Sequence, residues 1–145
     1  AVPGALQVTA WVEQYLSIPY LDMGRHCDGC DCWGLVRIVL AERADLHLPT
    51  HATVAAAGFN AKISEEAEHW LHVKQGSEKP FDVVRLRSTF VTRGIPVSSD
   101  IHLGIVTRKG WMLHTEEKTG PVHVRLDHPA IRGRIRQIYR HRDML

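Results

Sequence analysis

Cysteine is scarce in this sequence: there are three in 145 residues, all between Cys27 and Cys32. An odd number in so short a stretch excludes a framework of long-range disulfides, so the core is expected to hold together by packing. The chain also lacks a run of about 18 apolar residues, which excludes a membrane-spanning helix. Its first residues, Ala1 to Gly4, lack the charged and then apolar regions of a signal peptide. It begins without Met, so a processed or trimmed start stays open.

The composition fits one globular domain over residues 1–145. The chain is 44% hydrophobic and carries a net charge of +2. That is enough apolar material for a core and too little charge to indicate a partner. No internal repeat, low-complexity tract or linker interrupts the sequence.

Hydrophobic periodicity predicts helices first and strands afterwards. Helices are predicted from Ala5 to Ser17, from Cys32 to about Ala44, and from an N-cap at Ser64 to Gly76. Short strands separated by turn residues follow at 81–86, 101–107, 111–114, 122–126 and 134–139. This order predicts an α+β fold, with N-terminal helices packed on an antiparallel sheet of about five strands.

Cys32 is predicted to lie where a polar, glycine-bearing loop enters the second helix. The unpaired N–H groups and the positive dipole end of a helix N-terminus favour a thiolate, the reactive form of cysteine. Such positions lower a thiol pKa from about 8.5 to roughly 3.5–7.5. Cys32 is therefore a candidate nucleophile, and a buried structural cysteine that begins a helix is the alternative.

His102 and His114 are candidates for the base that a cysteine nucleophile needs. They lie at the start of one predicted strand and at the end of the next. A hairpin that pairs Thr107 with Trp111 would place His114 opposite Gly104 and diagonal to His102. Both imidazoles would then point to the same face of the sheet, close enough for one to orient the other.

Several motifs between about Trp11 and Val124 belong together. They are Pro19-Tyr20, Gly24, Asp31-Cys32-Trp33-Gly34-Leu35-Val36-Arg37, Asp82-Val83-Val84, His102-Leu103-Gly104-Ile105-Val106 and Trp111-Met112-Leu113-His114. This set resembles the NlpC-type cysteine peptidases, which are papain-like hydrolases of bacterial cell walls. The Asp-Cys-Trp-Gly-Leu-Val-Arg version resembles the branch in bacteriophage tail proteins, including the lambda tail K type and gene-transfer particles.

The resemblance implies a papain-like NlpC-type fold that hydrolyses a peptide bond of peptidoglycan without a cofactor. It implies Cys32 as the nucleophile, His102 as the base and His114 as the residue that orients the base. Tyr20 would either help to stabilise the oxyanion or pack under the loop. The Asp31 carboxylate would bond to nearby backbone. Trp33 would line the cleft or pack beneath it, and packing is favoured.

The branch resemblance also implies where the chain acts. It would be made in the cytoplasm without a signal peptide and would reach the bacterial wall in a virion tail or gene-transfer particle. Its substrate would be peptidoglycan stem peptides and its partners other tail-tip proteins, while neither a membrane nor nucleic acid is expected as a partner. An amidase, acyltransferase or transglutaminase-like reaction would use the same residues.

The sequence departs from the family pattern in three places. Arg25 replaces a second glycine after Gly24, Phe81 replaces a glycine ahead of the first strand, and the loop before Cys32 carries additional metal-binding residue types. These additional residues are His26, Cys27 and Cys30.

The additional cysteines open a rival interpretation, a small zinc module that uses Cys27, Cys30 and Cys32. Structural zinc usually takes a second ligand pair from elsewhere in the chain, and no second CxxC or HxxxH pair exists here. A disulfide between Cys27 and Cys30, or capture by Cys30 of a sulfenic acid at Cys32, also stays open.

The C-terminal segment is rich in arginine. The alternation of Arg132, Arg134 and Arg136 predicts that they share one face of a strand, with Ile135 on the opposite face. Such a face is usually solvated. The alternative is docking to an anionic protein, a teichoic-type polymer or nucleic acid, in which case the chain would be a structural tail or assembly protein.

Overall fold

Helix α2 (Cys32–Ala44) packs against a six-stranded sheet. The computed structural model describes residues 11–49, 67–87, 91–92, 95–96 and 102–145. In spatial order the strands are β3 (Trp70–Val73), β10 (Ile135–His141), β4 (Val83–Leu86), β7 (His102–Arg108), β8 (Trp111–Glu116) and β9 (Gly120–Arg125). All neighbouring pairs are antiparallel. The predicted α+β class is confirmed, and the sheet has one strand more than expected.

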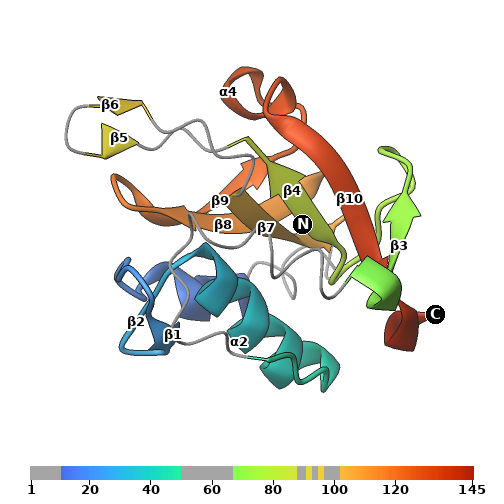
Figure 1. Ribbon diagram of the computed structural model, residues 1–145, viewed down its shortest axis with the longest axis horizontal. Coiled ribbons are helices and arrows are strands. Elements are labelled where there is room, and N and C mark those ends of the chain that lie inside the picture. The colour runs from blue at the N-terminus through green and yellow to red at the C-terminus, as the bar shows by residue number, and fades with distance from the viewer. Residues whose placement is uncertain (1–10, 50–66, 88–90, 93–94, 97–101) are drawn as a thin grey trace, which may run out of the picture.

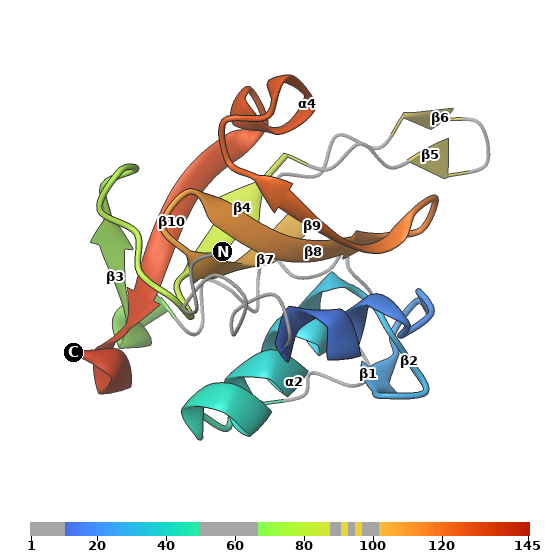
Figure 2. The same ribbon diagram turned by 180° about the vertical axis from the view of Figure 1, so that it is seen from behind.

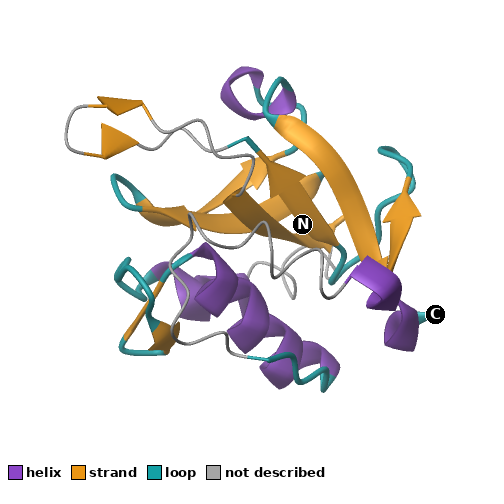
Figure 3. Ribbon diagram, viewed as in Figure 1, coloured by secondary structure: helices purple, strands orange, loops and turns teal. Residues whose placement is uncertain are grey.

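Shorter elements complete the described chain. Strands β1 (Arg25–His26) and β2 (Gly29–Cys30) form a hairpin directly before α2, and β5 (Val91–Thr92) pairs with β6 (Ile95–Pro96). The remaining helical turns are residues 11–16, η2 (Ala67–His69), α4 (Pro129–Arg132) and η3 (Arg142–Met144). Figures 1 and 2 show residues 11–16 and α2 on the same side of the sheet, and Figure 3 shows the strands in orange gathered above the purple helix α2. Among the described residues, no helix has both the length and the apolarity needed to cross a bilayer.

Helix α2 is enclosed by protein on nearly all sides. Its bounds match the prediction, and its first nine residues are buried except Arg37, which is half-buried. A helix that is apolar almost all round belongs in a core. It packs between the segment of Val12, Tyr15 and Ile18 and the sheet face of Val83, Leu103, Ile105 and Leu113.

The opposite face of the sheet carries a second core. Because side chains alternate along a strand, Val84, Val106 and Met112 point away from α2. They pack with Leu86, Leu126, Ile131 and Ile138. The sheet is thus covered on both faces, and its histidine-bearing hairpin is held in the middle.

The helix predicted from Ser64 to Gly76 is wrong from Trp70 on, since only Ala67–His69 form a helical turn. Residues Trp70–Val73 form strand β3, which pairs with β10 from Ile138↔Val73 to His141↔Trp70. Pairing with a distant strand overrides a short helical pattern, because strand preference depends on what lies alongside. Ser64 lies outside the described residues, as do Ala5–Ala10 of the first predicted helix and Ile101, the first residue of the strand predicted at 101–107.

The predicted arginine face is also wrong. Arg132 lies in α4, where Pro129 at the first position and the His128 side-chain cap begin a helical turn. Arg134 precedes β10 and pairs with Glu116, with side chains that are 12% and 21% exposed. The three arginines therefore do not line one strand face, and the docking hypothesis loses the pattern on which it rested.

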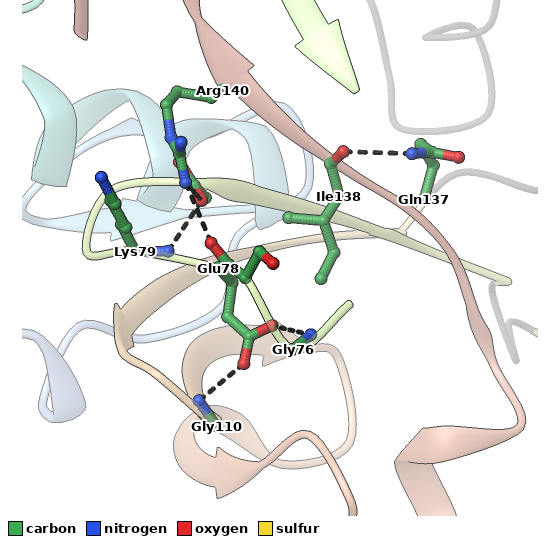
Figure 4. A network of polar contacts seen from close by, with 9 residues as sticks. Gly76, Glu78, Lys79, Gly110, Gln137, Ile138 and Arg140 are labelled. Atoms are coloured by element: carbon green, nitrogen blue, oxygen red, sulfur yellow. Dashed lines mark hydrogen bonds and ion pairs between the residues drawn. The ribbon is translucent and has the colours of Figure 1, made fainter. Parts of the chain in front are cut away.

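A buried carboxylate ties the β7–β8 turn to the rest of the fold (Figure 4). Glu78 is 5% exposed and accepts hydrogen bonds from the backbone N–H of Gly76 at 2.6 Å and of Gly110 at 2.9 Å. Nearby, Arg140 of β10 donates to both oxygens of Asp82, just before β4. The bond from the Gly110 N–H to Glu78 holds the turn of the hairpin that carries both histidines.

Candidate active site

Cys32 is the first residue of α2, as predicted, and Asp31 caps the helix. One Asp31 oxygen accepts from the Gly34 N–H at 2.9 Å; the other accepts from the Met23 N–H at 3.2 Å and from Arg25 Nη1 at 2.8 Å. The Asp31 carboxylate thus bonds to backbone and also to an arginine. The Arg25 and Asp31 side chains are 3% and 0% exposed. Arg25, one of the departures from the family pattern, therefore neutralises a buried charge beside the candidate nucleophile.

Two glycines allow the loop to lie directly on the helix. A Cβ at Gly34 would come to 2.3 Å from the Gly24 carbonyl oxygen, and a Cβ at Gly24 to 2.4 Å from the Gly29 carbonyl oxygen. Such distances are too short for any side chain. The motif glycine two residues after Cys32 is thus needed for close approach of two backbones.

Tyr20 is held by the strand that precedes Cys32. It forms a bridge with Cys30, and the flanking residues bond through Cys30 N to Pro19 O at 3.1 Å and Leu21 N to Cys30 O at 3.0 Å. Its pKa is raised mainly by burial and next by the Cys32 thiolate. The Tyr20 hydroxyl therefore stays protonated, as a hydrogen-bond donor must, and Cys32 is among the groups whose charge acts on it.

His102 and His114 lie on adjacent strands and contact each other. Strand β7 pairs with β8 so that His114 is opposite Gly104, as predicted. The predicted pairing of Thr107 with Trp111 is wrong, because a bulge shifts the register and Trp111 pairs with Arg108. His102 Nε2 lies 2.7 Å from His114 Nδ1, and the two side chains are buried.

Glu116 is a neighbour of this pair that the sequence interpretation missed. Its Oε1 lies 3.5 Å from His102 Nε2, and it also accepts from Arg134 Nη2. The signal was available: the register that places residue 114 opposite 104 also places residue 116 opposite 102. Arg134 comes from the distant segment before β10, so nothing local could have identified it.

The Cys32 sulfur lies beside the backbone of the residue after His102. The Leu103 N–H hydrogen-bonds toward the sulfur, as does the Trp33 N–H of the helix itself. His102 Nδ1 is buried and has no hydrogen-bond partner among the described residues. One nitrogen of His102 is thus engaged by His114, and the other is left open.

Burial dominates the protonation of these groups. It raises the pKa of Cys32 to about 12, against the lowering effect of the Leu103 and Trp33 N–H groups, so the expected low thiol pKa is wrong for this state. Burial likewise lowers the pKa of His102 well below its ordinary value and that of His114 to about 4. At neutral pH the site holds a thiol and two neutral imidazoles.

The two histidines belong to a group of side chains that could in principle bind a metal ion. Within the described part of the chain, His102, His114 and Glu116 offer ligand atoms within 4.8 Å of one another. Two nitrogens on one tetrahedral zinc ion would lie roughly 3.3 Å apart, farther than the 2.7 Å between the imidazoles. Glu116 Oε1 already forms an ion pair with Arg134, so it is not a free metal ligand. The arrangement fits a hydrogen-bond network better than an ion site.

The three-cysteine zinc alternative finds no such grouping among the described residues. Cys27 is exposed in the β1–β2 turn, whereas Cys30 and Cys32 are buried, and all three are free thiols. Trp33 is 5% exposed, and its indole N–H donates to the Pro49 carbonyl at 3.2 Å. It packs beneath the site, as favoured from the sequence.

A thiol at a helix N-terminus, bonded to the backbone of the strand that carries one of two paired imidazoles, offers the residue types needed for nucleophilic attack on a carbonyl. Residues 17–140, which include Cys32, His102 and His114, match the family model described as the NlpC/P60 family. No curated protein matches the chain.

Solved structures share the fold. A Staphylococcus aureus protein described as similar to lipoprotein, NLP/P60 family, has a TM-score of 0.62 at 16% identity, over 97% of this chain and 42% of that one. A Bacillus cereus NlpC/P60 family protein has a TM-score of 0.64 at 15% identity, over 97% and 41%. The NlpC/p60 domain of the peptidoglycan hydrolase SagA has a TM-score of 0.57 at 17% identity, over 96% and 99%. The chain thus spans about two fifths of the length of the first two proteins.

Proposed function

Because the chain belongs to the NlpC/P60 family, we propose that it is a cysteine peptidase that hydrolyses a peptide bond in peptidoglycan stems or cross-links. The observation that supports this most directly is that the two ring nitrogens of His102 have different surroundings. Its Nε2 is engaged by His114 at 2.7 Å, its buried Nδ1 is left without a partner among the described residues, and the backbone N–H of the next residue, Leu103, bonds to the Cys32 sulfur.

In the first half of the reaction, His102 Nδ1 takes the Cys32 proton as the sulfur attacks the scissile carbonyl carbon. The carbonyl electron pair moves to oxygen, where the Cys32 N–H and the Tyr20 hydroxyl stabilise the negative charge. The oxyanion then collapses and the C–N bond breaks. His102 gives its proton to the leaving amine, and a thioester remains on Cys32.

In the second half, His102 takes a proton from water, which attacks the thioester carbon. The C–S bond breaks, Cys32 regains its proton from His102, and the carboxyl product leaves. His114 keeps the proton of neutral His102 on Nε2 and stabilises the charged imidazolium, the part that an aspartate takes in other triads.

Mass spectrometry of muropeptides after incubation with the protein tests this function. New fragments are expected with the wild type and with Cys27→Ala, whose exposed thiol lies outside the proposed machinery. None are expected with Cys32→Ala or His102→Ala, and fewer with His114→Ala. Equal activity of Cys32→Ala and the wild type would end the proposal. The fragment masses would also separate a peptidase from an amidase or a transferase.

The finer proposal is that the chain works in a bacteriophage tail or gene-transfer particle, with other tail-tip proteins as partners. Its support is the Asp31-Cys32-Trp33-Gly34-Leu35-Val36-Arg37 motif, which resembles that branch. Proteomic analysis of purified particles tests it. Peptides of this chain that stay with particles through a density gradient are expected, and their restriction to the soluble lysate would contradict the proposal.

A further inference from the structure

Two charged residues beside the histidines have no part in the mechanism above. Glu116 ends β8, on the strand face of His114. Arg134 belongs to the arginine-rich C-terminal segment. The two form an ion pair with side chains that are 21% and 12% exposed, so the charges are partly withdrawn from solvent and are screened less than surface charges.

The pair is held in place from outside the histidine hairpin. Arg134 Nε donates to the Arg87 carbonyl oxygen at 3.0 Å. The Arg87 backbone N–H in turn donates to the Arg134 carbonyl oxygen at 2.7 Å. Glu116 in turn places Oε1 at 3.5 Å from His102 Nε2. The segment before β10 is thereby connected to the proposed base through one carboxylate.

We infer that Glu116 is a positioning residue for His102, anchored by Arg134, and that this ion pair sets how readily His102 carries charge during the reaction. The inference rests on the proposed function, since it needs His102 to act as the base. Glu116 Oε1 lies 3.5 Å from His102 Nε2, so the carboxylate favours a proton on that nitrogen, which His114 also contacts, and leaves Nδ1 unprotonated in the neutral imidazole. Its negative charge also stabilises the imidazolium that forms when the thiol gives up its proton.

The two charges act on His102 in opposite directions. A carboxylate nearby favours the charged imidazole, whereas a guanidinium disfavours it. Arg134 lowers the pKa of both histidines, and Glu116 raises that of His114. The charged and titratable groups that the structure assigns to the surroundings of His102, among the described residues, are His114, Glu116 and Arg134.

Opposite effects provide a test that does not need a substrate. In a Cys27→Ser background, which removes the exposed thiol, the rate of Cys32 alkylation by iodoacetamide at pH 7 reports the fraction of reactive thiolate. Glu116→Gln keeps the side-chain shape and removes the charge, so it should slow alkylation about tenfold, as expected for about one pKa unit. Arg134→Gln should accelerate it, and Arg134→Lys should stay near the parent rate. Arg140→Gln, which breaks a comparable pair with Asp82 near the far end of β4, should leave the rate unchanged.

Imidazole ¹⁵N shifts of His102 and His114 provide a second readout on the same variants. Glu116→Gln should lower the pH midpoint at which the imidazole pair becomes charged, and Arg134→Gln should raise it. Shifts in the same direction, or no shift in either variant, would overturn the inference, because a purely structural role predicts one sign for both. If the shifts are opposite but muropeptides stay intact, the positioning role stands and the proposed peptidase activity is wrong.

Discussion

Gly34→Ala should destabilise the protein, although the same substitution usually stabilises a helix. Alanine is favoured over glycine inside a helix by roughly 1 kcal/mol. Here the new Cβ would come to 2.3 Å from the Gly24 carbonyl oxygen, about 1 Å inside the ordinary contact range of 3.4–4 Å. The obstacle cannot rotate away, because the Gly24 carbonyl accepts hydrogen bonds from Asp31 N at 3.3 Å and from Arg25 Nη1 at 3.0 Å.

The magnitude follows from these opposing effects. Overpacking of a well-packed core usually costs about 1–3 kcal/mol, and a backbone obstacle puts this site at the upper end. After subtraction of the propensity gain, the free energy of unfolding should fall by about 2 kcal/mol. For a chain of this size that corresponds to a Tm about 4–8 °C lower.

Thermal and urea unfolding provide the assay, with Gly133→Ala as the matched control. Gly133 has a φ of −75°, and a Cβ added there would have no neighbour within 4 Å among the described residues, so alanine fits without contact. The control should be stabilised by about 0.5 kcal/mol, because alanine restricts the unfolded chain. A Gly34→Ala protein as stable as the wild type would refute the explanation of the motif glycine by close backbone approach.

Further substitutions test the buried charges around the site. Asp31→Ala should cost about 3–5 kcal/mol, because it takes the carboxylate away from the buried Arg25; if urea unfolding shows a loss below about 1 kcal/mol, the ion pair has been misjudged. Through His114 alone, wild-type stability should fall by about 3 kcal/mol from pH 6.5 to pH 4, since the unfolded chain takes up a proton while folded His114, with its pKa lowered to about 4, is only half protonated; His102, whose pKa is also lowered, adds to the fall. His114→Gln should flatten that fall, and parallel stability curves would contradict the assignment. Glu78→Ala should cost about 3 kcal/mol, since it frees two backbone N–H groups; Glu78→Gln keeps one acceptor oxygen and should cost less, and equal losses would contradict this by showing that a neutral amide cannot replace the carboxylate.

The resting protonation state has a consequence for reactivity. With the Cys32 pKa raised and the pKa values of both histidines lowered by burial, the thiol is protonated near pH 7. In the proposed mechanism the nucleophile therefore forms by proton transfer to His102 during attack, and groups that stabilise the imidazolium are expected to control the rate. This is why the Glu116–Arg134 pair is expected to affect alkylation even without a substrate.

The sequence by itself determined the parts of this protein that depend on local pattern. The bounds of α2, the α+β order and the position of His114 opposite Gly104 all follow from 3.6-residue and 2-residue periodicities. The family also followed from short motifs, and the family model confirms it. The part of the site that lies on α2 and on one hairpin could be predicted for the same reason.

Only the tertiary structure decided what depends on partners distant in the chain. Residues Trp70–Val73 form a strand because β10 lies beside them. Arg134 lies beside Glu116 because the segment between α4 and β10 returns to the hairpin. Cys32 has a raised pKa because the sheet buries the helix end, a larger effect than the N-terminal N–H groups that the sequence suggested. Burial and long-range pairing depend on the whole chain, so no window of sequence around these residues contains them.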